Sequence, residues 1–375
     1  MLLHITHETR YDYTPPVETA QHLAHLKPRN TGSQQLLGHS LVVSPTPAQR
    51  SESLDLYGNT RAFFALESTH NELVVTAESL VQTSVPTLDA LIARELTWEQ
   101  VRERFRYHKG SAYDPSVDFV FPSPYVPRHD DFAAYARPSF SAGRPVFEAA
   151  NDLMQRIFQD FDYDAKSTEI NTPAVDALAQ RKGVCQDFAH IMIACFRTLG
   201  LPARYVSGYL LTQPPPGKPR LVGADASHAW ASVYLPGRDG PGGWVDFDPT
   251  NGRQPGEDYV TLAIGRDYSD VSPMRGVLHG GARHTLKVGV TVQPVEERHD
   301  AKAQKPVAET TQSQTQMQSQ SPLQSQSQSQ SNMQPTTRFQ CNAPSTQFHN
   351  SASLTRFQDD LPPTQFQSQS FFPAS

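Results

Sequence analysis

The sequence is poor in cysteine, has no long apolar run and carries no strong excess of charge of one sign. Its three cysteines, Cys185, Cys195 and Cys341, are too few and too unevenly spaced for a disulfide framework, which favours a reducing compartment. No apolar run approaches the roughly 20 residues of a membrane-spanning helix, and the N-terminus lacks the apolar core of a secretory signal. We therefore expect a cytoplasmic protein that makes no membrane contact.

The charge is mild and evenly distributed. The formal net charge is -6 and the isoelectric point is about 6.1, with Lys and Arg scattered among Asp and Glu. Because nucleic-acid-binding proteins gather basic residues into a stripe or patch, this distribution argues against a nucleic-acid partner.

Aliphatic residues are scarce in one part of the chain only. Hydrophobic residues make up 37% of the sequence and the mean hydropathy is -0.51, although the middle is densely apolar. Residues 300–375 are mostly Gln and Ser and cannot bury enough surface to offset the entropy of ordering, so we predict a disordered tail. Within it, segment 337–348 recurs at 355–366. We interpret the repeat as drift in an unconstrained tail; the alternative is a duplicated docking motif.

The N-terminal region, residues 1–85, is predicted to be a small β domain. Strands are expected at 54–57, 62–66 and 73–81, because these runs are rich in Leu, Val, Phe and Thr. The dipeptide Gly58-Asn59 between the first two is typical of a two-residue hairpin.

Residues 86–145 are predicted to connect this domain to the rest of the chain. A helix is expected near 98–105, whereas repeated prolines predict no regular structure in the aromatic stretch 113–132. We interpret this stretch as a connector packed on its neighbour; the alternative is a substrate-binding loop.

The region 146–295 is predicted to be a mixed helical and β core. Periodicity predicts helices over 146–161, 172–181 and 185–199, and strands over 203–211, 226–235, 243–248 and 286–292. Thr172 is expected to cap the second helix, and the last strand is expected to close the core.

A cysteine opens the third of these helices. In GVCQDFAH, residues 183–190, a glycine turn delivers Cys185 to the first helical turn, where unpaired N–H groups and the helix dipole favour an anion. A thiolate is the reactive form of cysteine, so this position suits a nucleophile, and the same N–H groups can stabilise an oxyanion. Alone the signal is weak, because cysteines at helix starts are often inert.

Partners for this cysteine follow on two predicted strands. His228 shares one strand face with Trp230, while the opposite face is apolar, and a histidine beside a cysteine can take the thiol proton and return it to the leaving amine. Asp248 ends the next strand just before a proline and can orient the imidazole. Asp246, two residues earlier, would project to the same side and is the alternative carboxylate.

Four motifs in one order resemble the core of the transglutaminase-like superfamily: GVCQDFAH, RYVSGYL, SHAW and GWVDFDPTN. The N-terminal β region and the stretch AIGRDYSDVSPMRG are similar to the bacterial branch, so the resemblance covers roughly residues 1–295. It implies an α+β fold with a papain-like core, in which a nucleophile helix packs on an antiparallel sheet. It also implies a catalytic triad of Cys185, His228 and Asp248, and it favours Asp248 over Asp246.

Other candidate residues receive smaller roles. Gln186 or the indole of Trp230 or Trp244 could assist the oxyanion, although a packed tryptophan is more common. His190 faces away from Cys185 on the helix and is predicted to be structural, and Cys195 lies on the apolar stripe and is predicted to be inert. The short ligand spacings of zinc sites and the acidic loops of calcium sites are missing, so we predict no metal and no cofactor.

The expected function is attack by Cys185 on an amide of a peptide or protein substrate, through a thioester intermediate. Hydrolysis would make the protein a peptidase or amidase, and capture by a lysine amine would make it a cross-linking acyltransferase. Hydrolysis is favoured, because transfer requires a site that excludes water. A third alternative is a non-catalytic binding module on the same fold, against which the intact set of three residues argues.

Overall fold

The computed structural model describes residues 1–86, 95–110, 113–212, 227–237, 242–280 and 283–295. The predicted disordered tail and its repeated segment lie outside the described residues. Within the described ranges, no helix has the length and apolar character needed to cross a membrane.

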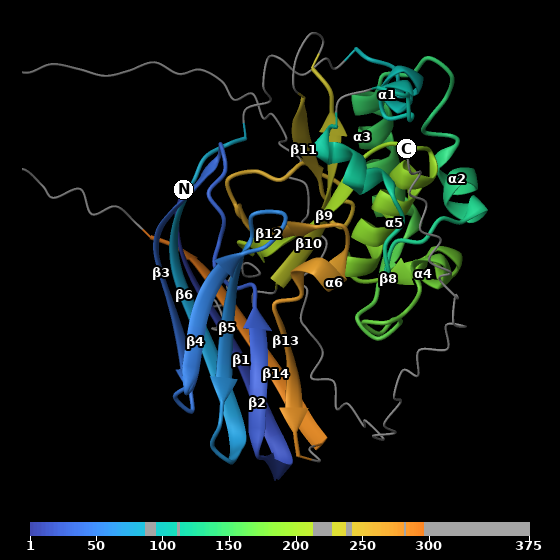
Figure 1. Cartoon of the computed structure of the whole chain (residues 1–375). Helices are drawn as coiled ribbons and strands as arrows, with labels where there is room; N and C mark the ends of the chain where they lie inside the picture. Colours follow the sequence, from blue (N-terminus) through green and yellow to red (C-terminus); the bar gives the residue numbers. More distant parts are fainter. Residues whose placement is uncertain (87–94, 111–112, 213–226, 238–241, 281–282, 296–375) are drawn as a thin grey trace, which may run out of the picture.

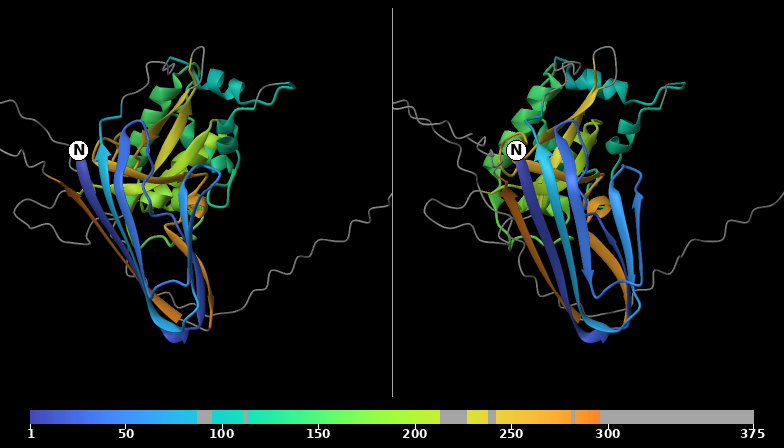
Figure 2. Two further views of the ribbon diagram at one scale, coloured as in Figure 1. Left: turned by 60° about the vertical axis from the view of Figure 1, so that its left-hand side comes forward. Right: turned by 90° about the vertical axis from the view of Figure 1, so that its left-hand side faces the viewer.

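The N-terminal β domain is a sandwich of two four-stranded antiparallel sheets that face each other (Figure 2). One sheet has the order β14-β1-β6-β3, formed by Arg283–Pro294, Leu2–Val17, His70–Thr83 and Gln34–Ser44. The other has the order β13-β2-β5-β4, formed by Met274–His279, Thr19–Ala24, Thr60–Leu66 and Gln49–Leu54. The predicted β domain is therefore confirmed; β5 and β6 are longer than the expected strands at 62–66 and 73–81, and β1, β2 and β3 were not predicted.

The last two strands of the described chain return to this domain. β14 was expected to close the catalytic core, but it pairs with β1 from Leu3 opposite Pro294 to Thr14 opposite Arg283. β13 likewise pairs with β2. Alternation along a strand reports that one face is buried and carries no information about which sheet supplies the neighbour, so this expectation was wrong.

The first predicted hairpin is also different in detail. β4 ends at Leu54, and residues 55–59 form the loop, so the expected strand over 54–57 and its two-residue turn are wrong. The loop is organised by Asp55, whose Oδ1 accepts the backbone N–H groups of Tyr57 at 2.9 Å and Asn59 at 2.8 Å. A side chain that caps its own loop in this way stabilises a longer turn.

The connector is packed and partly helical. Helix α1 spans Trp98–Arg104, as expected. The proline-rich stretch, predicted to lack regular structure, contains a 3-10 helix at Pro115–Val120 and helix α2 at Asp130–Ala136. Proline is tolerated in the first turn of a helix, where its missing N–H is not needed, and Pro115 opens the 3-10 helix in this way. Buried side chains of Phe119, Val126 and Phe132 anchor the stretch to the core.

The core follows the predicted α+β arrangement. Helices α3, α4 and α5 span Val146–Asp160, Ala174–Gln180 and Cys185–Thr198, and the short strands β7 and β8 are Asp162–Tyr163 and Lys182–Gly183. The antiparallel sheet has the order β11-β10-β9-β12, formed by Gly243–Phe247, Ser227–Leu235, Ala203–Leu210 and Tyr259–Gly265. Strand β12 and the short helix α6, Tyr268–Val271, were not predicted. Thr172 does not cap α4; its hydroxyl accepts the N–H of Glu169 instead.

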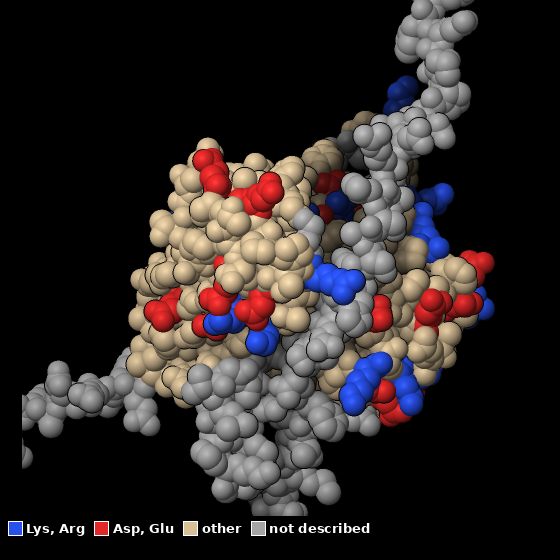
Figure 3. Space-filling model, turned by 90° about the horizontal axis from the view of Figure 1, so that it is seen from below, with Lys and Arg blue, Asp and Glu red and all other residues tan. Residues whose placement is uncertain are grey.

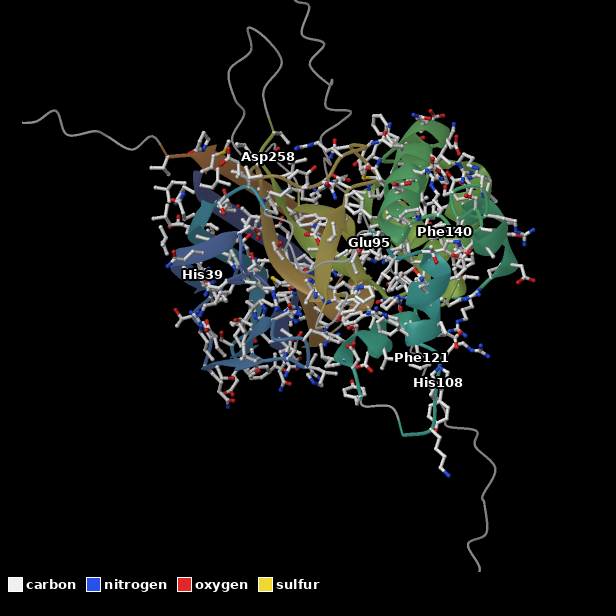
Figure 4. The ribbon with its side chains drawn as sticks, turned by 90° about the horizontal axis from the view of Figure 1, so that it is seen from above. His39, Glu95, His108, Phe121, Phe140 and Asp258 are labelled. Carbon is white, nitrogen blue, oxygen red and sulfur yellow. The ribbon has the colours of Figure 1, made fainter. Side chains whose placement is uncertain are left out.

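The core sheet lies between the helices and the β domain (Figure 1). On β10, Ala229, Ala231, Val233 and Leu235 pack in the same hydrophobic cluster as α5, as the alternation predicted. From β9 and β12, Tyr209, Val260 and Leu262 join the hydrophobic core of the β sandwich. Figure 4 shows this separation from above, with His39 on the β domain and Phe140 among the helices.

One buried arginine fastens α5 to the segments around it. Arg197 is 1% exposed, and its guanidinium donates to the carbonyls of Ala203 at 2.8 Å and Arg266 at 2.6 Å. It also donates to the carbonyl of Phe121 and the hydroxyl of Ser123 in the connector. A fully bonded guanidinium can be buried because its donors are satisfied, and this one fixes α5 relative to the sheet.

Candidate active site

A tight turn places Cys185 at the start of α5. Asp187 Oδ2 accepts the backbone N–H of Val184 at 2.9 Å and the hydroxyl of Thr168 at 2.6 Å. A Cβ at position 183 would lie 2.7 Å from the same oxygen, so only glycine allows this close approach. The turn is thus fixed before the helix begins, and Cys185 emerges from it with 7% of its surface exposed.

The first turn of α5 offers backbone donors near this thiol. The first hydrogen bond of the helix is donated by Phe188 to the carbonyl of Val184. The N–H groups of residues 185–187 therefore precede the helical ladder and point along the helix axis at its positive end. Such a position favours a thiolate and an oxyanion over their neutral forms.

His228 and Asp248 form a buried pair. His228 Nε2 lies 2.7 Å from Asp248 Oδ2, and the residues are 4% and 0% exposed. The alternative carboxylate, Asp246, lies elsewhere, since its Oδ2 accepts the indole N–H of Trp230 at 3.0 Å. Of Asp246 on β11 and Asp248 just after it, Asp248 alone contacts the histidine among the described interactions.

The Asp248 carboxylate is held ionised by its partners. Burial raises its pKa, but the charge and hydrogen bond of His228 and the hydrogen bonds from Asn251 and Tyr259 outweigh burial, so the pKa lies below its ordinary value. Asn251 Nδ2 and the Tyr259 hydroxyl each donate to Oδ2 at 2.7 Å. Oδ1 accepts the backbone N–H of Thr250 at 2.9 Å. An ionised carboxylate in this place keeps a proton on Nε2 of the histidine.

Tyr259 and Asn251 were not identified from the sequence. Tyr259 is the first residue of β12. The guanidinium of Arg253 lies over the Tyr259 ring at 4.7 Å. Arg253 also forms an ion pair with Asp258, which Figure 4 labels. Burial and the Asp248 charge raise the pKa of Tyr259 far above its ordinary value, so its hydroxyl remains a donor. Asn251 follows Asp248 in the turn, and its position within DPTN is a local signal that could have indicated a contact with Asp248.

Helix α5 and the adjacent strand β10 carry the two halves of the site, Cys185 and His228. Helix α5 packs against β10, and Cys185 belongs to the same hydrophobic cluster as Ala229, the residue after His228. Opposite His228 on β9 is Gly208, where a Cβ would lie 2.1 Å from the carbonyl of Val260 and 2.5 Å from the ring of Trp230. Gly208 therefore lets the indole lie against the backbone beside the histidine.

The other sequence candidates have structural contacts. Gln186 Nε2 donates to the carbonyl of Ile170 at 3.1 Å, and the indole N–H of Trp230 is bonded to Asp246. Trp244 packs under the guanidinium of Arg204 at 4.1 Å.

The remaining histidine and cysteine of α5 are buried. His190 accepts the backbone N–H of Tyr268 at 3.2 Å and stacks on Tyr125, and burial lowers its pKa to about 3. Cys195 is 0% exposed, and burial raises its thiol pKa. Both residues are buried in the core, which agrees with a structural His190 and an inert Cys195.

Metal ligands do not converge in the part of the chain that the structure describes, since no group of three or more His, Cys, Asp or Glu side chains is placed to hold an ion.

Basic and acidic side chains are interspersed on the face seen from below in Figure 3, so the described residues of that face form no patch of a single sign.

Comparison with known proteins assigns the chain to a family. The profile of the bacterial transglutaminase-like N-terminal region matches residues 3–82, and that of the transglutaminase-like superfamily matches residues 133–249. An uncharacterized protein of Mycobacterium tuberculosis is 39% identical over 295 residues, which cover 78% of this chain and 92% of the relative. The chain belongs to the transglutaminase-like superfamily.

Two further similar proteins are described as enzymes of different kinds. A protein-glutamine gamma-glutamyltransferase of Pseudomonas aeruginosa is 30% identical over 177 residues, which cover 45% of this chain and 25% of that protein. A solved structure from Cytophaga hutchinsonii, provisionally described as a cysteine protease, superposes with a TM-score of 0.59 at 24% identity and covers 79% of this chain and 92% of its own. That likeness confirms the fold. Cys185, His228 and Asp248 all lie within the matched superfamily region.

Proposed function

We propose that this transglutaminase-like protein is a thiol-dependent hydrolase of amide bonds in peptides or proteins. Cys185 is the nucleophile, His228 is the general base and acid, and Asp248 orients the histidine. The observation that carries the proposal is the buried 2.7 Å pair of Asp248 and His228, of which His228 is on β10, the strand against which the Cys185 helix packs. A buried imidazole and carboxylate pair beside a cysteine at a helix start is the arrangement that thiol catalysis requires.

The reaction follows from these positions. Because Asp248 engages Nε2, the thiol proton of Cys185 passes to Nδ1 of His228, and the thiolate attacks the amide carbonyl. The N–H groups of the first turn of α5 donate to the resulting oxyanion. The imidazolium then protonates the departing amine and leaves a thioester on Cys185. Water, deprotonated by His228, attacks the thioester and releases the carboxylic acid and the free thiol.

Acyl transfer to an amine is the second candidate, favoured by the similarity to the Pseudomonas aeruginosa enzyme named for that reaction. The triad would serve it equally, with an amine in place of water. Hydrolysis is preferred because water is always present, while efficient transfer needs a second site that binds the amine and excludes water. Two described cysteines are free thiols, which agrees with our proposal that the enzyme works in the reducing cytoplasm.

Product analysis distinguishes the two reactions. Incubating the enzyme with a mixture of Gln- and Lys-containing peptides and a millimolar tagged amine is expected to give mainly cleaved or deamidated peptides and little tagged adduct. The reason is that bulk water reaches a hydrolase thioester and an unbound amine competes poorly. Mass spectrometry of the peptides gives the ratio.

The matched control is Cys185→Ala, which removes the nucleophile and should give neither product. Tagged or Gln-Lys cross-linked peptides as the dominant species would establish the transferase. If the unmodified enzyme gave no product at all and Cys185 carried no acyl group, the chain would act as a binding module.

A further inference from the structure

A pocket lies between the β domain and the core, and its lining includes no residue of the triad. Its volume is about 430 Å³, within the usual range for small-ligand sites. The lining comes from His25 just after β2, the β4–β5 loop and β5 on one side, and from the connector, Arg266, α6 and β13 on the other. Arg266 of this lining follows the end of β12, whose first residue, Tyr259, touches Asp248. At about 3.3 Å per residue, the two ends of β12 are about 20 Å apart.

Of the arginines that line this pocket, one is paired with a described carboxylate and two are not. Arg266 is neutralised by Asp270, with two bonds of 2.9 and 3.0 Å. Within the described ranges, Arg61 and Arg275 form no ion pair with a carboxylate. The Nε atom of Arg61 is buried and has no hydrogen-bond partner, and Arg275 donates to the carbonyl of Ser269 at 3.3 Å. Asp55 and Asp118 also line the pocket, but neither forms an ion pair with Arg61 or Arg275 in the described ranges, so these two guanidinium groups can still bind an anion.

A buried histidine provides an independent indication of a ligand. His25 is 2% exposed and lines the pocket. Its Nδ1 lies 3.1 Å from the carbonyl of Ser272 and therefore donates to it, while its Nε2 has no hydrogen-bond partner and lies 3.8 Å from Oδ2 of Asp55. Burial lowers the pKa of His25, and this effect outweighs the hydrogen bond to Ser272 and the charge of Asp55, so the ring is neutral near pH 7 and Nε2 is an acceptor. An unpaired buried acceptor is costly, and a ligand N–H would satisfy it.

Apolar side chains complete the pocket wall. Leu56 and Phe121 are 84% and 55% exposed, large values for residues that line a cavity, and Tyr57 and Pro122 lie beside them in the lining. Figure 4 labels Phe121 in the connector. Exposed apolar groups next to unpaired donors suit a ligand that is itself part apolar and part anionic.

We propose that this pocket binds the C-terminal end of a peptide, or an N-acylated amino acid, with an apolar last residue. The terminal carboxylate pairs with Arg61 and Arg275, the N–H of the same residue donates to His25 Nε2, and the apolar side chain packs on Leu56 and Phe121. This site is separate from the reaction at Cys185, so the proposal does not depend on the activity of the triad.

Calorimetric titration of the full-length Cys185→Ala chain with N-acetylphenylalanine and with its amide tests the proposal. The acid should bind and the amide should bind at least about tenfold more weakly, because a charge-assisted pair of hydrogen bonds is lost. Arg275→Gln and Arg61→Gln should each weaken binding of the acid about tenfold or more. Arg283→Gln, an exposed arginine at the start of β14, is the control and should bind as tightly as the parent.

Folding is checked by the thermal unfolding midpoint of each variant. If Arg61→Gln unfolds, the exposed Arg275 still carries the test. Equal binding of acid and amide, an equal loss with Arg283→Gln, or no binding of N-acetylphenylalanine or N-acetylleucine at millimolar concentration would overturn the assignment.

Discussion

Replacing Asp248 with Asn is expected to lower turnover about 10⁴-fold while the fold persists. The amide keeps the size of the carboxylate, but its single oxygen can accept from only one of Thr250, which donates to Oδ1, and Tyr259, which donates to Oδ2, and it carries no charge. It therefore neither stabilises the imidazolium of His228 nor holds the required tautomer. The loss corresponds to about 5 kcal/mol of transition-state stabilisation. The measurement is the steady-state rate on a peptide identified by product analysis.

Asp246→Asn is the matched control, because it makes the same chemical change two residues away on the same strand. Asp246 accepts the indole N–H of Trp230 and does not contact His228 among the described interactions, so the rate should fall far less. A larger loss with Asp246→Asn than with Asp248→Asn would show that the wrong carboxylate has been assigned.

Acidification from pH 6.5 to 4 is expected to destabilise the protein through buried neutral histidines. Burial lowers the pKa of His7 from 6.5 to about 4, so in this interval the unfolded chain binds a proton that the folded chain does not. Stability is therefore complete above the unfolded value and falls as the pH drops, by about 3 kcal/mol for His7 alone. His22 and His190, with pKa values lowered to about 4 and about 3 by burial, act in the same direction.

Urea unfolding at pH 7, 5.5 and 4.5 measures this effect. His7 contacts the hydroxyl of Tyr209 at 3.0 Å and so links β1 to β9. His7→Gln costs stability at every pH, yet it should flatten the decline between pH 6.5 and 4 because one titrating group is gone. His108→Gln, at an exposed site, is the control. A slope that is unchanged by His7→Gln would contradict the account of His7. The pKa of Asp248 is lowered in the folded protein, so its ionised form stabilises the fold above about pH 4. This contribution is lost only as the pH falls further.

The sequence patterns correctly predicted features that depend on residues close together in the chain. The helix that begins at Cys185 follows from a glycine turn and a helical stripe, and both are present in the structure. The alternation around His228 correctly placed Ala229 and Ala231 on the face that packs against α5. These features are set by residues within a few positions of one another, which is the range over which periodicity and turn chemistry act.

Contacts between residues far apart in the chain could not be predicted from such patterns. Nothing in the alternation of β14 indicates that β1, at the other end of the described chain, is its neighbour. Tyr259 reaches Asp248 because the chain turns after β11 and returns along β9, and the sequence of β12 alone does not show this. The pocket between the β domain and the core is lined by Arg61 of β5 and Arg275 of β13, which are far apart in the sequence. In each case a contact depends on the assembled sheets.

The pH dependence of Cys185 alkylation tests the central claim most directly. Iodoacetamide labelling between pH 5 and 9, followed by peptide mapping, should show Cys185 reacting with a midpoint well below the reference value of about 8.5. N-acetylcysteine in the same tube is the reference thiol, and Cys195, which is 0% exposed, should stay unlabelled. His228→Ala should move the midpoint for Cys185 upward. Labelling of Cys185 at pH 6 no faster than the reference thiol, with no effect of His228→Ala, would contradict a catalytic pair of Cys185 and His228.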